Sequence, residues 1–468
     1  MRAELLVIGG GLGGYVGALR ASQLGKRVIL AEKEDRLGGV CLNVGCISSK
    51  ALIHGAELLC GAGNSEELGI SAKPELDFPQ LQGWKESVVK KLTDGVALLC
   101  RGNGVKVIRG RAKFAGPYEA VIATEEGALK LEFENALIAT GSRPIELPGL
   151  EFDGELILNS TDALALKDIP EELLVVGGGY IGLEIGTAYA KLGSRVTIIE
   201  MMEQLLPGTD QELVRPVARN LKKLGIEVHL RSKVIGVERR GEGAEVSVEA
   251  PQGKETFSAE KVLVTIGRRP NSEELGLEEG GIEVDGKGFI KVNEQFHTTA
   301  EHIYAVGDVS GGPLLAHKAL KEGELAAVAL AGVPSPRFKV IPAAIFTDPE
   351  IATVGLTEAE AREQGHEPII GKFPYGALGR ALTLDEPDGF IKLVADGEGR
   401  LLGAQVVGAG ASELISEATL AIELGARLED LARTIHPHPT LSEGWGEAAE
   451  AALGWPIHIL PRRGKRSP

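Results

Sequence analysis

Two cysteines that lie five residues apart are the side chains in this sequence best suited to redox chemistry. Cys41 and Cys46 occur within the stretch GGVCLNVGCISSK. A disulfide needs Cα atoms about 4.4–6.8 Å apart, whereas five residues of regular helix rise about 7.5 Å. The pair can therefore bridge only across an irregular turn, which Gly45 would permit. Two unpaired buried thiols and half of a metal site are the alternatives, although Cys60 and Cys100 supply no second ligand pair of the usual zinc spacing.

A histidine and a glutamate near the end of the chain form a second candidate group. His438 and Glu443 occur within HPHPTLSE. A histidine oriented by a carboxylate is an arrangement that general base catalysis uses. The alternative is a surface loop that leads into a helix, with Ser442 and Glu443 at the helix start. The cysteines favour the base, because thiol–disulfide exchange requires a group that deprotonates the attacking thiol.

A repeated pattern predicts the elements that position these groups. An apolar strand, a glycine-rich turn, a helix, a second strand and an acid occur twice in the same order. The copies consist of residues 5–8, 9–14 and Glu32, and of residues 173–176, 177–182 and Glu200. In both copies the acid stands 23 residues after the first glycine.

The spacing within each copy matches what a dinucleotide requires. The first glycine allows a tight turn, the second lets the backbone approach a pyrophosphate, and the third lets the helix pack closely on the strand. The pyrophosphate then lies at the helix N-terminus, and the acid accepts hydrogen bonds from ribose hydroxyls. One such match is weak in a chain with 63 glycines, but two with the acid at the same offset predict two dinucleotide-binding units. The glycines are Gly9, Gly11 and Gly14 in the first copy and Gly177, Gly179 and Gly182 in the second.

The ends of the two units indicate domain boundaries. A strand leads into TGSRP at 140–144 and another into GRRPN at 267–271. From about residue 340 the pattern changes, with alternating strands at 390–395 and 401–407 and helices at 411–425 and 428–432. We therefore expect an α/β protein with two Rossmann-like domains and a C-terminal α+β domain. The predicted domains are 1–146 with 272–339, then 147–271, then 340–460, followed by a basic tail at 461–468.

Composition limits the class of protein. With 468 residues, 43% of them apolar and 25% charged, the chain has the composition of a folded multidomain protein and not of a disordered or disulfide-scaffold one. A net charge of −16 argues against nucleic acid or an anionic membrane as the main partner. Four cysteines and the absence of a secretory pattern at the start predict a reducing cytoplasm, and no apolar stretch has the ~20 residues of a membrane span.

Taken together, these motifs resemble the pyridine nucleotide disulfide oxidoreductases. The resemblance runs in colinear order from residue 4 to about 460, through GGVCLNVGCISSK, ATG at 139–141, GLE at 182–184, GD at 307–308, AHKA at 316–319 and HPHPTLSE. Within the family, the chain resembles the members that oxidise dihydrolipoyl groups with NAD+. The resemblance implies that the first unit binds FAD, the second binds NAD, and the C-terminal domain forms a homodimer.

The resemblance also implies a role for each candidate residue. Cys41 is expected to exchange with the dithiol substrate, and Cys46 to lie against the flavin as charge-transfer donor. His438 is expected to be the base and Glu443 its orienting group, both supplied by the partner subunit. The other expected contacts are Lys50 near the flavin and paired with Glu184; Glu32, Thr140, Gly141, Asp308 and Ala316 at FAD; and Glu200 and Gly267 at NAD. No metal is expected.

The implied reaction is oxidation of protein-bound dihydrolipoamide to lipoamide by NAD+. The expected partner is the lipoyl-bearing acyltransferase of a 2-oxo acid dehydrogenase complex or the lipoyl protein of glycine cleavage. A related NAD(P)H-dependent disulfide or metal-ion reductase is the alternative. No cysteine follows Cys100, which counts against a mercuric reductase, and Glu200 offers no cation to an NADP 2′-phosphate. A non-catalytic nucleotide-binding subunit is disfavoured, because both thiols, Lys50 and His438 are present.

Two local departures from the family pattern carry expectations of their own. Serine stands at position 48, where the family usually has proline, and predicts a less rigid turn after Cys46. Gly444, Trp445 and Gly446 follow the candidate base loop, and the two glycines predict a weak helix start.

Overall fold

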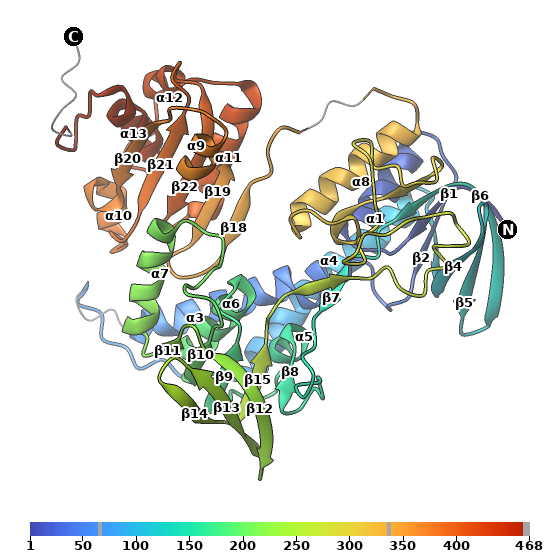
Figure 1. Ribbon diagram of the computed structural model, residues 1–468, viewed down its shortest axis with the longest axis horizontal. Helices are drawn as coiled ribbons and strands as arrows, with labels where there is room; N and C mark the ends of the chain where they lie inside the picture. The colour runs from blue at the N-terminus through green and yellow to red at the C-terminus, as the bar shows by residue number, and fades with distance from the viewer. Residues whose placement is uncertain (64–67, 335–337, 462–468) are drawn as a thin grey trace. The chain divides into compact units, whose positions relative to one another are not determined.

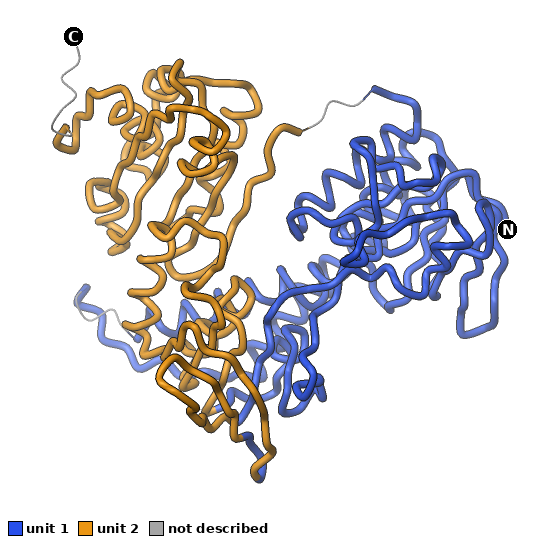
Figure 2. Tube along the Cα trace, viewed as in Figure 1, with its two compact units in different colours: residues 1–170, 241–244, 260–336 blue, residues 171–240, 245–259, 337–468 orange. Residues whose placement is uncertain are grey.

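A computed structural model describes residues 1–63, 68–334 and 338–461. The chain divides into two compact units (Figure 2). Unit 1 comprises residues 1–170, 241–244 and 260–336, and unit 2 comprises residues 171–240, 245–259 and 337–468. Apart from residue 461, the predicted basic tail lies outside the described residues. The predicted domain boundaries remain predictions.

Unit 1 is built on a seven-stranded mixed sheet (Figure 1). Its parallel strands are β1 (Arg2–Ile8), β2 (Val28–Glu32), β3 (Lys106–Arg109), the C-terminal half of β6 (Gly127–Ile138) and β17 (Ile303–Ala305). Antiparallel strands β4 (Arg111–Gly116) and β5 (Glu119–Thr124) extend the sheet from β6. The carboxyl ends of the parallel strands share one edge, which is where open α/β sheets bind ligands.

Both faces of this sheet are covered, which explains the continuous apolar run in β1. Leu6 and Ile8 belong to one buried cluster, whereas Leu5 and Val7 belong to another. Successive strand residues point to opposite faces, so each face buries alternate side chains, as parallel sheets require. Helices of unit 1 are α1 (Leu12–Gln23), α2 (Gly39–Val44), α3 (Cys46–Gly63), α4 (Phe78–Gly102), α5 (Ser160–Leu164) and α8 (Ala316–Leu330), with the 3-10 turn η2 (Gly307–Ser310).

Two short strand pairs also have both of their strands in unit 1. Strand β7 (Ser142–Pro144) pairs antiparallel with β16 (Arg268–Pro270), and β8 (Ile157–Leu158) pairs parallel with β15 (Lys261–Val264). The β7–β16 pair joins the segment TGSRP at 140–144 to the segment GRRPN at 267–271.

Unit 2 contains the second copy of the repeat. Strands β9 (Glu172–Val176), β10 (Arg195–Ile199) and β11 (Glu227–His229) are parallel, and α6 (Tyr180–Lys191) connects the first two. Helix α7 (Gln211–Lys223) precedes β11, and β12 (Lys233–Arg240), β13 (Gly243–Ala250) and β14 (Gly253–Ala259) form a separate three-stranded sheet. Four residues of the β12–β13 hairpin, 241–244, cluster with unit 1.

The C-terminal part of unit 2 is an antiparallel sheet in the order β18-β19-β22-β21-β20 (Figure 1). Its strands are β18 (Ala343–Ile345), β19 (Ile351–Gly355), β20 (Ile369–Pro374), β21 (Phe390–Ala395) and β22 (Leu401–Val407). The accompanying helices are α9 (Glu358–Glu363), α10 (Gly379–Thr383), α11 (Ala411–Leu424), α12 (Leu428–Arg433) and α13 (Glu443–Leu453), with the 3-10 turn η3 (Tyr375–Ala377). The predicted fold class, with two Rossmann-like units and an α+β C-terminal region, is confirmed. No helix in the described ranges has the length and apolarity that a membrane span needs.

Candidate active site

The two cysteines face each other across a break between two helices. Cys41 lies in α2, Cys46 is the first residue of α3, and Gly45 separates the helices with φ −143° and ψ −112°. The thiols are close enough to hydrogen-bond, and this contact, together with burial, raises the pKa of Cys41 far above its ordinary value. A side chain at position 45 would lie 2.9 Å from the carbonyl oxygen of Val40. The turn that the sequence required of Gly45 is therefore present.

Lys50 and Ser48 lie in the first turns of α3. The ammonium group of Lys50 is near enough to lower the pKa of Cys41, against the larger opposing effects of Cys46 and burial. The buried Ser48 hydroxyl donates a hydrogen bond to the Gly45 carbonyl oxygen at 3.1 Å. This bond ties the serine to the turn that proline would otherwise stiffen.

The first glycine-rich turn connects β1 to α1 and is held by Glu32. Gly9 has φ +100°, a conformation that glycine adopts without steric cost. The Glu32 carboxylate is buried at the end of β2 and accepts hydrogen bonds from the backbone N–H of Gly10 at 2.6 Å and of Glu34 at 2.9 Å. No side chain caps the start of α1, so its first N–H groups are available to phosphate oxygens.

The second glycine-rich turn reproduces this geometry at the level of individual hydrogen bonds. Gly177 has φ +108°, and the buried Glu200 carboxylate accepts from the backbone N–H of Gly178 at 2.6 Å and of Met202 at 2.7 Å. Gly179 precedes α6, which also lacks a side-chain cap. Both turns therefore fit a dinucleotide diphosphate at the helix start, with a carboxylate placed to accept from ribose hydroxyls.

The remaining predicted FAD contacts lie near the carboxyl edge of the unit 1 sheet. Asp308 follows β17, and its carboxylate accepts a hydrogen bond from the Ser142 hydroxyl, which in turn accepts from Nε of Arg268 at 2.8 Å. Thr140 follows β6, and its hydroxyl donates to the Asn271 carbonyl oxygen at 2.7 Å. The carbonyl oxygen of Gly141 accepts a hydrogen bond from the Asn271 N–H, and Ala316 is the first residue of α8.

Two more of the predicted site residues have contacts within their own units. They are Gly267, which was predicted to contact NAD, and Glu184, which was predicted to pair with Lys50. The Gly267 carbonyl oxygen accepts from the Ile145 N–H at 3.1 Å in unit 1. The Glu184 carboxylate lies buried in α6 and accepts from the Phe346 N–H at 2.9 Å in unit 2. Since Lys50 belongs to unit 1, its pairing with Glu184 remains a prediction.

His438 and Glu443 form the predicted pair. Nδ1 of His438 lies 2.8 Å from Oε1 of Glu443, and the backbone N–H of Thr440 donates to Oε2 at 2.8 Å. Burial raises the pKa of Glu443, but these hydrogen bonds outweigh it and hold that pKa below its ordinary value. A carboxylate only accepts, so Nδ1 carries the proton and Nε2 is the ring nitrogen able to take up another. The His438 side chain is 78% exposed, as a base that meets a substrate requires.

A second histidine–carboxylate pair lies beside the first and was not predicted. Nε2 of His436 lies 2.8 Å from Oε1 of Glu417 in α11, and this hydrogen bond raises the pKa of His436, whose side chain is 8% exposed. A side chain at Gly446 would lie 3.3 Å from the His436 ring, and one at Gly444 would lie 2.5 Å from Ile391. Helix α13 nevertheless begins at Glu443, and its two glycines lie where the neighbouring side chains leave little space for a Cβ atom.

A buried ion pair behind the Asp308 turn was also not predicted. Lys318 and Glu322 lie one turn apart in α8, with side chains 6% and 8% exposed and the Nζ–Oε1 distance at 3.0 Å. The spacing of four residues is a helical ion-pair pattern, but sequence alone does not show that the pair is buried.

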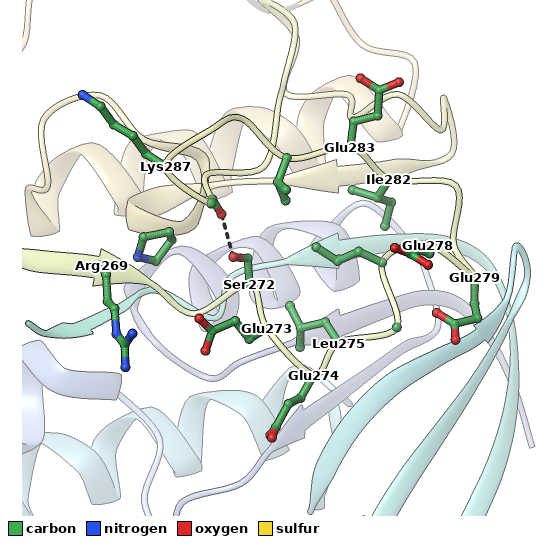
Figure 3. A pocket seen from close by; sticks show the side chains of 15 residues that line it. Arg269, Ser272, Glu273, Glu274, Leu275, Glu278, Glu279, Ile282, Glu283 and Lys287 are labelled. Carbon is green, nitrogen blue, oxygen red and sulfur yellow. Dashed lines mark hydrogen bonds between the residues drawn. The ribbon is translucent and has the colours of Figure 1, made fainter.

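Unit 1 contains a cavity of about 810 Å³ whose lining includes none of the predicted site residues (Figure 3). Five glutamates line it, opposed by Arg269 and Lys287; they are Glu273, Glu274, Glu278, Glu279 and Glu283. So acidic a lining disfavours an anionic dinucleotide. Within the described ranges, no cluster of three or more His, Cys, Asp or Glu side chains has the arrangement of a metal site.

Comparisons with known proteins agree with this geometry. Residues 3–323 match the family model of pyridine nucleotide-disulphide oxidoreductases, and residues 341–449 match the dimerisation domain of the same family. The dihydrolipoyl dehydrogenases of Bacillus subtilis and Haloferax volcanii are each 50% identical to this chain, over 464 and 466 residues that cover 98% of both sequences in each comparison.

Solved structures show the same fold. LpdA from Mycobacterium tuberculosis is 28% identical with a TM-score of 0.89, covering 96% of this chain and 99% of that one. The HOCl-induced flavoprotein disulfide reductase RclA from Escherichia coli is 28% identical with a TM-score of 0.85 and the same coverage. The family implies a flavin and a pyridine nucleotide as cofactors. From its paired thiols, its two nucleotide turns and these matches, the chain belongs to the pyridine nucleotide-disulphide oxidoreductase family.

Proposed function

We propose that this chain is a dihydrolipoyl dehydrogenase that oxidises protein-bound dihydrolipoamide with NAD+ through FAD and a Cys41–Cys46 disulfide. The contact between the two thiols beside the first nucleotide turn carries the proposal. Helix α2, which holds Cys41, starts directly on that turn, since the Gly38 N–H donates to the Gly10 carbonyl oxygen at 2.8 Å. A side chain at Gly39 would lie 2.7 Å from the Gly11 Cα. The dithiol is therefore built onto the loop that would hold the FAD diphosphate.

FAD would be held in unit 1, where it would accept two electrons from the thiol pair and pass them to NAD+. The Gly9–Gly14 turn would bind its diphosphate and Glu32 its adenosine ribose. Lys50 and Asp308 would lie against the flavin and ribityl portions. The remaining contacts would come from Thr140, Gly141 and Ala316. The Gly9–Gly14 turn, Glu32, the pair Thr140 and Gly141, and Asp308 support these assignments, because they lie at or just after the carboxyl ends of β1, β2, β6 and β17.

NAD would be held by the second turn, through Gly177, Gly179, Gly182 and Glu200, with Gly267 completing the site. The Glu200 carboxylate already accepts two backbone N–H groups, which fixes it at the end of β10. Each oxygen keeps a lone pair for a ribose hydroxyl. A 2′-phosphate would meet the same carboxylate as a like charge, which favours NAD over NADP.

The thiol step follows from the pair and the base. Nε2 of His438 takes a proton from one dihydrolipoyl thiol, and the resulting thiolate attacks the Cys41 sulfur of the disulfide. The Cys41–Cys46 bond breaks, a mixed disulfide forms on Cys41, and Cys46 leaves as a thiolate. The second dihydrolipoyl sulfur then attacks the substrate sulfur of the mixed disulfide, and its proton passes to Cys41, which leaves as a thiol while lipoamide is released. The substrate loses two electrons and two protons, and the cysteine pair gains the two electrons.

The dimerisation domain supports a homodimer in which His438 and Glu443 serve the Cys41–Cys46 pair of the partner subunit. Lys50 would pair with Glu184 next to the flavin. We retain 1–146 with 272–339 as the FAD domain, 147–271 as the NAD domain and 340–460 as the dimerisation domain. The proposed partner is a lipoyl-bearing acyltransferase of a 2-oxo acid dehydrogenase complex or the lipoyl protein of glycine cleavage.

The test is a comparison of substrates with the purified flavoprotein. We expect rapid NADH formation from dihydrolipoamide and NAD+, and much slower oxidation of NADH or NADPH with glutathione disulfide, Hg²⁺ or Cu²⁺. Cu²⁺ is included because the structure of RclA has also been determined as a Cu(II) complex. Faster turnover with any of these acceptors than with dihydrolipoamide would favour a related disulfide or metal-ion reductase.

A further inference from the structure

The two side chains of the buried ion pair in α8 bind backbone groups of the turn that carries Asp308. Nζ of Lys318 donates to the Gly311 carbonyl oxygen at 2.8 Å and to the Gly307 carbonyl oxygen at 3.4 Å. Oε2 of Glu322 accepts from the Gly307 backbone N–H at 2.8 Å and from Lys318 at 3.0 Å. The ammonium group thus holds both ends of the turn, and the carboxylate holds its first N–H.

The helix that presents this pair is itself fixed against the first nucleotide turn. Helix α8 packs on α1 (Figure 1), and a side chain at Gly323 would lie only 2.1 Å from the Gly13 carbonyl oxygen. Gly13 lies in the first turn of α1, the helix that begins at the predicted diphosphate site. Any shift of the Asp308 turn relative to that site must therefore break contacts of Lys318 and Glu322.

Stability alone is a poor explanation for such a pair. Removing two charges from water costs several kcal/mol per ion, and apolar residues of similar volume often serve a fold equally well. Burial accordingly raises the pKa of Glu322, with the Lys318 charge acting against that shift. What the charges supply is geometry, because three backbone groups of one short turn are bound by two side chains of one helix.

We propose that Lys318 and Glu322 are positioning residues that hold Asp308 in the orientation needed to bind FAD. They touch no cofactor in this account and act through the Gly307–Gly311 turn. The carboxylate of Asp308 is fixed from the other side by the Ser142 hydroxyl, so the turn and the serine together determine where it points. The inference rests on the proposed function, in which Asp308 contacts FAD.

A double-mutant cycle on FAD affinity tests this positioning role. Apoprotein would be prepared from wild type, Lys318→Gln, Asp308→Asn and the double variant, and FAD dissociation constants would be measured by flavin fluorescence well below the unfolding temperature. Lys318→Gln should weaken FAD binding roughly tenfold or more, since it leaves carbonyl groups and a buried carboxylate without their cation. In the Asp308→Asn background the same change should weaken binding by less than about threefold. Lys321→Gln is the matched control, because Lys321 forms an exposed ion pair on the same helix, and it should change FAD affinity less than about twofold.

The outcomes separate the possible failures. Equal effects of Lys318→Gln in both backgrounds, or unchanged FAD affinity in the single variant, would overturn the positioning role. Wild-type protein that binds no FAD would instead refute the proposed function. If Lys318→Gln does not fold, Glu322→Gln enters the same cycle, because its amide oxygen still accepts from the Gly307 N–H while the charge is lost. The expected and contradicting results are then the same.

Discussion

The substitution Gly14→Ala should prevent FAD binding because the first nucleotide turn has no space for a methyl group. A Cβ atom at position 14 would lie 1.8 Å from the Gly9 carbonyl oxygen and 3.2 Å from the Ala139 Cβ. Contacts of a Cβ atom below 3.0 Å essentially do not occur, so α1 and β1 must separate by about 1.2 Å, the difference between 3.0 and 1.8 Å. That movement displaces the N–H groups of α1 from the diphosphate position.

The cost of the substitution combines strain and lost binding. Forcing one methyl group into a packed site costs about 1–3 kcal/mol, and here the obstacle is backbone that cannot rotate away. A cost of about 2.7 kcal/mol, which lies in the upper part of this range, corresponds to roughly a 100-fold loss of FAD affinity. The assay is the ratio of flavin to protein absorbance after purification, followed by FAD titration of the apoprotein. We expect Gly14→Ala to be isolated largely without flavin.

Gly83→Ala is the matched control. Gly83 also lies in a helix of unit 1, α4, but a Cβ atom there would meet nothing within 4 Å. Alanine in place of an exposed helical glycine should raise stability by up to about 1 kcal/mol and leave flavin content unchanged. A Gly14→Ala protein with wild-type flavin content and affinity would refute the close approach of helix and strand described here.

Three further predictions concern the coenzyme, the partly buried His436 and the dimer. The kcat/KM value of wild type should be roughly 100-fold higher with NADH than with NADPH, and Glu200→Gln should lower this ratio. Comparable kcat/KM values of wild type with both coenzymes would contradict the role given to the second turn. The pKa of His436 is raised above 6.5, so its bond to Glu417 stabilises the fold at pH values below about 6.5 and loses this effect as pH rises through the raised value. His436→Gln should therefore cost about 1–3 kcal/mol of unfolding free energy in acid and much less in alkali; a pH-independent loss in denaturant unfolding would contradict this. Mixing inactive Cys41→Ser and His438→Gln proteins under subunit exchange should restore about a quarter of wild-type activity, because about half of the dimers are then heterodimers and each heterodimer has one intact site of two. No recovery after proven exchange would place the thiols and the base in one chain.

The elements of the site that follow from local sequence were predictable. Gly45 was required between Cys41 and Cys46 because regular helix holds residues five apart too far from each other, and the structure breaks the helix at that residue. The two nucleotide turns were predictable for the same reason, since the conformation of Gly9 and the reach of Glu32 depend on a short stretch of chain.

Contacts between distant segments were not predictable from spacing. The partner of His436 is Glu417 on another helix, and the Asp308 turn depends on Lys318 from a helix whose amphipathic pattern does not reveal burial of its charge. Helix propensity alone does not explain Gly444 and Gly446, which lie within α13. Tertiary packing leaves little space for a side chain there, next to Ile391 and His436, and this packing becomes visible only once the sheet and loop are in place.

The most direct test of the central claim is an anaerobic titration of the oxidised FAD protein with dihydrolipoamide, without NAD+. In wild type we expect one equivalent to produce a long-wavelength charge-transfer band, because the opened disulfide leaves the Cys46 thiolate against the flavin. Cys46→Ser should show no such band, and Cys41→Ser should show no reaction with the dithiol. Equal flavin reduction by dihydrolipoamide in wild type and in both variants would contradict the account, since electrons would then reach FAD without the cysteine pair.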